Sequence, residues 1–243
     1  MTAIETKNLT KKYKNITAVD GLNLSIAEGE LFALLGVNGA GKSTAIKMLS
    51  CLTKPTSGQA VLLGDSIIDA PLAVKQKINV SPQETAVAPN LSVRENLELI
   101  YGIYGHEKKA AKEKANDMIE AFGMGEIAEN RAKTLSGGWQ RRLSIAMALI
   151  SEPSILFLDE PTLGLDVIAR RELWKFISKL KGKITIILTT HYLEEAEALA
   201  DRIGIMSKGK LKALGTAKEL IEQSKTSNFE DAFLFFADKE ALL

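Results

Sequence analysis

The chain has 243 residues, a formal net charge of +1 and 46% hydrophobic residues. This length suits one large domain or a core with a subdomain, and the balanced charge gives no support to nucleic-acid binding, which expects a strong basic excess. A single cysteine, Cys51, excludes an internal disulfide, and no apolar run approaches the roughly eighteen residues that span a bilayer. We therefore expect a soluble, cytoplasmic protein in which Cys51 is a small buried side chain.

The first third of the sequence alternates as β structure does. Segments 4–9 and 22–26 are predicted as antiparallel strands, and segments 59–63 and 78–81 as further short strands. The continuous apolar segment 31–35 predicts a fully buried strand.

A glycine-rich loop lies between the strand at 31–35 and a predicted helix at 45–49, and it fits the phosphate-loop pattern. Its residues are Gly36, Val37, Asn38, Gly39, Ala40, Gly41, Lys42, Ser43 and Thr44. Glycines let backbone N–H groups turn toward a phosphate, and the positive end of the following helix adds to that field. We expect Lys42 to reach the β- and γ-phosphates and Ser43 to hold Mg²⁺. The sequence therefore predicts a nucleoside triphosphate site.

The middle of the chain is helical. Ser92 and Glu95 form a predicted capping box at the start of a helix over 92–104. A charge-rich helix is predicted over 107–122, and we interpret residues 84–150 as a helical insert.

An α/β pattern resumes after residue 150. The predicted strands are 155–158, 184–188 and 203–206, and the predicted helices are 167–180, 192–200, 218–222 and 228–236. This alternation predicts an α/β fold with a mainly parallel central sheet, beside an antiparallel β subdomain and the helical insert. We expect a single domain over 1–243. Its parts would be a core with the β subdomain (1–83 and 151–220), a helical subdomain (84–150) and a helical tail (221–243).

Two acids follow the apolar strand at 155–158. A strand that ends in carboxylates places them at the carboxyl edge of the sheet, beside the phosphate loop. We expect Asp159 to bind Mg²⁺ and Glu160 to polarise the attacking water as a general base. The alternative interpretation is a solvated acidic turn, which the phosphate loop makes less favoured.

A second glycine turn, Ser136-Gly137-Gly138, precedes an apolar helical segment at 143–150. A serine cap and two glycines make a second anion-binding helix start. One nucleotide needs only one such loop, so we expect this turn to cap the γ-phosphate of a nucleotide bound to another copy. The alternative is an ordinary serine-capped helix.

These motifs, in this order, resemble the nucleotide-binding subunits of ATP-binding-cassette (ABC) transporters over nearly the whole chain. The resemblance implies a P-loop NTPase fold and a head-to-tail dimer that sandwiches two ATP molecules, with Mg²⁺. It also assigns roles to four further residues, each of which would be unremarkable alone. Tyr13 would stack on adenine, Gln83 would contact Mg²⁺ or the attacking water, Asp166 would lie in the loop after the acids, and His191 would hold the γ-phosphate and orient water.

The resemblance also implies partners. With no membrane span, the transport path would lie in separate permease subunits, docked near residues 83–104 and holding the chain at the cytoplasmic face of the membrane. The dimer would form with a second copy or another ABC ATPase subunit, and no nucleic acid is expected. Segments 189–203 and 228–234 resemble the branch of drug, sodium and polysaccharide exporters.

Two alternatives remain at this stage. A soluble ABC-type ATPase acting on nucleic acid or ribosomes is less favoured, because the chain has one cassette, no heptad run and balanced charge. A nucleotide sensor without turnover is disfavoured by Glu160 and His191. Trp139 fills a variable position of the signature, where it would shape a contact if exposed and only pack if buried.

Overall fold

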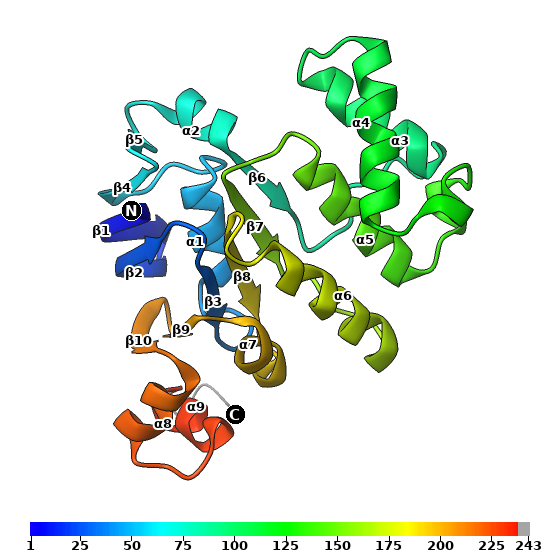
Figure 1. The fold of residues 1–243 in the computed structure, drawn as a ribbon. Coiled ribbons are helices and arrows are strands. Elements are labelled where there is room, and N and C mark those ends of the chain that lie inside the picture. The colour runs from blue at the N-terminus through cyan, green and yellow to red at the C-terminus, as the bar shows by residue number, and fades with distance from the viewer. Residues whose placement is uncertain (238–243) are drawn as a thin grey trace.

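Short apolar strands build the centre of the protein, for which the computed structural model describes residues 1–237. A six-stranded sheet runs in the order β10-β9-β3-β8-β7-β6 (Figure 1). Strands β6, β7, β8, β3 and β9 pair in parallel, and β10 pairs antiparallel with β9. The bounds are β3 Leu31–Leu35, β6 Ile78–Ser81, β7 Ile155–Asp159, β8 Thr185–Thr190, β9 Arg202–Ser207 and β10 Lys210–Gly215. The predicted mainly parallel sheet is confirmed, although the sequence did not predict β10.

Every residue of β3, β7 and β8 is buried, because helices cover both faces of this sheet. Alternate residues of β7 enter different clusters: Leu156 and Leu158 pack with residues of α5 (Gly137–Leu149) and α6 (Val167–Leu180), and Phe157 packs with residues of α1 (Lys42–Leu49). The sheet therefore holds the loops at its carboxyl edge on a rigid base.

The second sheet is antiparallel and has the order β2-β1-β4-β5. Its strands are β1 Thr2–Tyr13, β2 Ile16–Ala27, β4 Ser57–Leu62 and β5 Asp65–Ser66, so β1 and β2 are longer than predicted. Helix α2 (Pro71–Lys77) follows and was not predicted, because Val74 is its only buried residue and gives no helical period.

Gly58 lies where β4 meets a register shift in β1. It has φ +78°, and a Cβ there would lie 2.1 Å from the carbonyl oxygen of Asn8. We expect Gly58→Ala to lower the free energy of unfolding by about 2 kcal/mol or more, because left-handed strain and a backbone clash add. Gly21→Ala is the matched control: its φ is +61° with nothing within 4 Å of the new Cβ, so only the strain of about 1 kcal/mol remains. Urea unfolding would measure both, and equal losses would contradict the clash.

The helical subdomain lies on the side of the molecule away from the β1–β2 hairpin (Figure 1). Helices α3 (Val93–Ile103) and α4 (Lys108–Ala121) form it with short 3₁₀ turns at Gly125–Ile127 and Ala132–Thr134. The predicted capping box is confirmed: Ser92 Oγ accepts from the Glu95 N–H at 3.1 Å, and Glu95 Oε2 accepts from the Ser92 N–H at 2.7 Å.

The helices near the C-terminus pack against strands β3 and β9 of the central sheet. Helices α7 (Leu193–Leu199), α8 (Ala217–Ser224) and α9 (Phe229–Phe236) share a cluster with β3 and β9, in which Phe229 and Phe233 are buried. The last six residues of the predicted tail, 238–243, lie outside the described part of the chain.

Cys51 is only partly buried, so the prediction that its side chain is buried is wrong. Helix α1 ends at Leu49, and Cys51 sits beyond it in a left-handed turn with φ 57°. Partial burial raises the pKa of the Cys51 thiol.

Among residues 1–237, none of the helices combines the length and the apolar character that crossing a bilayer requires.

Candidate nucleotide-binding site

A cleft of about 720 Å³ opens at the carboxyl edge of the central sheet, around the loop between β3 and α1. It brings together residues that are distant in sequence and were predicted to act together. Those lining it are Tyr13, Asn38, Gly39, Ala40, Gly41, Lys42, Ser43, Thr44, Gln83, Glu160 and His191. This size lies within the range of small-molecule sites in proteins.

The phosphate loop can adopt its conformation because Gly41 has no side chain. Gly41 has φ +106°, and a Cβ there would lie 2.3 Å from the carbonyl oxygen of Ala18. Helix α1 begins at the next residue, Lys42, so its unpaired first-turn N–H groups lie at the loop. This end of α1 favours an anion such as a phosphate.

Lys42, Glu160 and His191 form a connected chain of polar groups. Lys42 Nζ lies 3.1 Å from Glu160 Oε1, and His191 Nδ1 lies 2.7 Å from Glu160 Oε2. Lys42 Nζ also donates to the carbonyl oxygens of Gly36 at 2.7 Å and Val37 at 3.4 Å. Lys42 and Glu160 are each only 5% exposed, so each charge depends on the other for compensation. Gly36 and Val37 therefore contact Lys42 through their carbonyl oxygens. These two residues are not among those that line the cleft.

Glu160 is placed by its backbone. It follows the last residue of β7 with φ 50°, a left-handed conformation that is uncommon for a residue with a side chain. Its N–H donates to the carbonyl oxygen and to the Oγ1 of Thr189, each at 3.1 Å. Two bonds from the neighbouring strand thus fix the turn that presents the carboxylate.

Asp159 and Ser43 meet beside this group. Ser43 Oγ donates to Asp159 Oδ1 at 3.0 Å, and Thr189 Oγ1 donates to the same oxygen. Carboxylate and hydroxyl oxygens are the ligands that Mg²⁺ prefers, so this pair fits the predicted ion. Sequence reasoning missed Thr189, whose signal was its position at the end of β8, opposite Asp159.

The second glycine turn lies outside this cleft. Ser136 and Gly138 line a separate hollow of about 60 Å³ with residues of α6. Ser136 occupies the N-cap position of α5 as predicted, but its side chain makes no capping hydrogen bond. Asp166 caps α6 by accepting from the N–H groups of Ile168 and Ala169, both at 2.9 Å.

Trp139 is half-buried and packs against the core beneath the helical subdomain. The Arg142 guanidinium lies 4.5 Å above its ring and also pairs with Glu172 at 2.7 Å. Trp139 thus matches neither of the two outcomes in full: its ring packs against the core, and it also lines the hollow beside Ser136.

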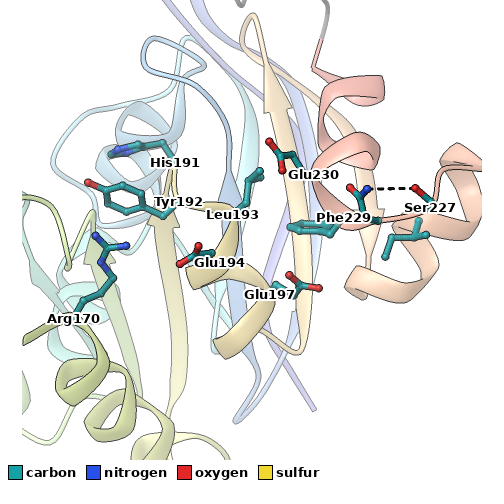
Figure 2. A pocket seen from close by; sticks show the side chains of 11 residues that line it. Arg170, His191, Tyr192, Leu193, Glu194, Glu197, Ser227, Phe229 and Glu230 are labelled. Carbon is teal, nitrogen blue, oxygen red and sulfur yellow. Dashed lines mark hydrogen bonds between the residues drawn. The ribbon is translucent and has the colours of Figure 1, made fainter. Parts of the chain in front are cut away.

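His191 borders a second cavity, of about 750 Å³, between α7 and the α8–α9 pair (Figure 2). Tyr192 lies between His191 and Arg170. The ring centroids of Tyr192 and His191 are 4.1 Å apart, and the Arg170 guanidinium lies 4.7 Å from the centroid of the Tyr192 ring. The other histidine, His106, is exposed, and its ring stacks on that of Tyr101 with centroids 3.9 Å apart.

Glu195 lies in α7, four residues after His191, and is completely buried. Burial raises the pKa of Glu195, against the lowering effect of its hydrogen bonds. Trp174 Nε1 donates to Glu195 Oε1 at 2.9 Å, and the half-buried Trp174 packs against the core.

Residues that the sequence did not single out complete the cleft. They are Ile16, Thr17, Ala18, Leu163, Lys208 and Gly209. The first three follow the β1–β2 turn beside Tyr13, and the last two form the β9–β10 turn, which lies beside β2 only in the folded chain.

Comparison with known proteins supports this description. The family model described as "ABC transporter" matches residues 19–163. The chain is 43% identical over 231 residues to the probable multidrug ABC transporter ATP-binding protein YbhF of Escherichia coli K12, a match that covers 95% of this chain but 40% of that protein. It is 39% identical over 240 residues to the linearmycin resistance ATP-binding protein LnrL of Bacillus subtilis, covering 95% and 77%.

A solved structure has the same fold. The dimeric post-hydrolysis state of the ATP-binding cassette MJ0796, bound to ADP and Pi, superimposes with a TM-score of 0.79 and 29% identity, covering 88% of this chain and 98% of the other.

Proposed function

Because the chain belongs to the ABC transporter family and carries its ATP-binding domain, we propose that it binds and hydrolyses ATP to drive a separate membrane permease. The observation that carries this proposal is the linked set of Lys42, Glu160 and His191 in the phosphate-loop cleft. The names of the relatives do not favour the alternative of a soluble ATPase acting on nucleic acid or ribosomes.

The reaction begins with an exchange of partners. When ATP binds, Lys42 Nζ pairs with the γ-phosphate in place of Glu160. The Glu160 carboxylate can then accept a proton from the attacking water. The water oxygen bonds to the γ-phosphorus while the bond to the ADP oxygen breaks, and that oxygen keeps the electron pair. His191 donates to the developing charge and keeps Glu160 oriented. Tyr13, 45% exposed at the cleft, offers its ring to adenine.

Mg²⁺, held by Ser43 and Asp159 with Gln83 nearby, would neutralise phosphate charge when bound.

We propose that the site is completed by a second ATP-binding subunit. Ser136 is exposed, and its hydroxyl is unused as a cap within its own helix. It stands outside the cleft that holds Lys42. The γ-phosphate of an ATP bound to the facing subunit would accept hydrogen bonds from the Ser136 hydroxyl and from the N–H groups of Gly137 and Gly138. Asp166 would hold the neighbouring helix start in place.

A mixing experiment tests this arrangement. Lys42→Met and Ser136→Arg are each expected to be inactive alone. Half of the randomly formed dimers in an equal mixture would pair the two variants, and each such dimer has one intact site, so the mixture should recover about a quarter of wild-type ATPase activity. Recovery would be read by phosphate release after co-refolding or co-expression. A mixture that stays inactive, while each variant still folds, would contradict shared sites between copies.

We propose that the permease docks on the helical subdomain. A hollow of about 200 Å³ lies between β6, α3 and α5, and its lining includes Pro82, Ile103, Tyr104, Ser144 and Met147. Ile103 is 69% exposed and Tyr104 45% exposed, and an apolar partner surface would cover them. Docking there would hold the chain at the cytoplasmic face of the membrane. The names of the relatives support an exporter, and the chain spans 40% of the length of YbhF.

A further inference from the structure

Arg141 is an arginine inside the protein. It lies in the second turn of α5, three residues after Gly138, and is only 4% exposed. Arginine is almost never so buried without partners. Its Nη1 donates to the carbonyl oxygen of Pro82 at 2.6 Å, and its Nη2 donates to the carbonyl oxygen of Gln83.

A second contact lies one turn further along the same face of α5. Ser144 Oγ and Ser81 Oγ are hydrogen-bonded at 3.0 Å, and both side chains are buried. Residues three apart on a helix share a face, so Arg141 and Ser144 point to the same partner. Helix α5 is therefore bonded to three consecutive residues, Ser81, Pro82 and Gln83.

Two carboxylates favour the charged form of Arg141. Burial lowers the pKa of Arg141, and the nearby carboxylates of Asp159 and Glu195 oppose that lowering. The guanidinium donates to two adjacent main-chain carbonyls, and its planar fork suits two such acceptors better than a lysine would.

The two segments that Arg141 joins line different hollows. Gln83 lines the nucleotide cleft, whereas Ser136 and Gly138, at the start of α5, lie outside it. Pro82 and Ser144 also line the hollow proposed for the permease. Residues 82–91 contain no helix or strand of their own, so side-chain bonds determine where Gln83 stands.

We propose that Arg141 is a positioning residue that fixes the main chain at Gln83 to helix α5, so that Gln83 and the Ser136–Gly138 turn move as one body. This inference rests on the proposed ATPase function. Arg141 is not among the residues that line the nucleotide cleft, and it acts on the rate through Gln83 and through the angle of α5.

The test compares Arg141→Gln with Arg141→Lys and a matched control. Arg141→Gln should lower kcat about tenfold with KM for ATP changed less than about threefold, because Lys42 and the phosphate loop are untouched. Arg141→Lys keeps one donor and should recover part of that loss. Arg202→Gln is the control: Arg202 also donates to a distant carbonyl, that of Ser25 at 2.6 Å, and pairs with Glu30. The Arg202→Gln variant should lose thermal stability without a change in kcat per folded molecule.

A disulfide at the Ser81–Ser144 contact distinguishes an effect of position on kcat from an effect of stability. Ser81→Cys and Ser144→Cys are introduced together in an Arg141→Gln, Cys51→Ala background and oxidised with copper phenanthroline. The cross-linked fraction, counted by thiol titration, should regain at least about half of the lost kcat and lose it again on reduction.

The outcomes are distinct. A wild-type kcat for Arg141→Gln, a fall no larger than that of Arg202→Gln, or a cross-linked protein as slow as its reduced form would each overturn the role of Arg141. A wild-type chain without ATP turnover, alone and with its permease, would instead overturn the proposed function.

Discussion

Glu160→Gln is expected to lower ATP turnover by about 100-fold or more while ATP still binds. The amide keeps the size of the side chain and can still hydrogen-bond to His191, but it cannot accept the proton of the attacking water. It also no longer holds Lys42 by charge, so the lysine is freed for the phosphate, and ATP affinity should rise. Phosphate release at saturating ATP would measure turnover, and equilibrium binding of a fluorescent ATP analogue would measure affinity.

Glu197→Gln is the matched control, because it makes the same change on an exposed glutamate of α7. Its turnover should equal that of the wild type. In the same preparations, ATP-loaded Glu160→Gln should accumulate as a dimer in size-exclusion chromatography. Turnover within a few-fold of the wild type would remove Glu160 from the role of general base.

Lys42→Met should weaken ATP binding by about 100-fold, since a charge-assisted contact to two phosphates is lost. The same change should lower the free energy of unfolding by about 3 kcal/mol, because it leaves the Glu160 carboxylate buried with His191 alone. The double variant Lys42→Met, Glu160→Gln should recover most of the stability and none of the binding. Urea unfolding and titration with the fluorescent analogue separate the two effects.

Lys47→Met provides the control on the same helix, where the lysine side chain is exposed. It should change neither quantity by more than about 0.5 kcal/mol. If the double variant were no more stable than Lys42→Met alone, the buried ion pair would not be the source of the loss.

Elements with one strong local signal were predictable from the sequence. The strands β3 and β6 and helix α6 have the predicted bounds. Strand β3 reads as a short apolar run because all of its residues are buried, whereas β6 alternates apolar and polar residues. Part of the cleft was predicted for a similar reason: the phosphate loop and the acids after β7 each follow an apolar strand. Tyr13, Gln83 and His191 were assigned only through the family resemblance. The meeting point of the phosphate loop and the acids follows from the parallel sheet.

Features that depend on distant segments were not predictable. Helix α2 buries one side chain, and β10 is recognised only by its pairing with β9. Thr189 and Arg141 look ordinary in the sequence, and their importance comes from Asp159 and from the Gln83 loop, which the fold brings to them. A cap position was predictable at Ser136, but not that its hydroxyl would remain unused within the chain.

The left-handed backbone at Glu160 limits which substitutions can give information. Asparagine and aspartate tolerate φ near 50°, and glycine prefers it, so these replacements remove or alter the carboxylate and keep the turn. Valine, isoleucine and threonine do not tolerate it, and they would move Asp159 as well as delete the base. A saturation library at this codon should therefore split its inactive members into well-folded and misfolded sets, and only the first set reports on chemistry.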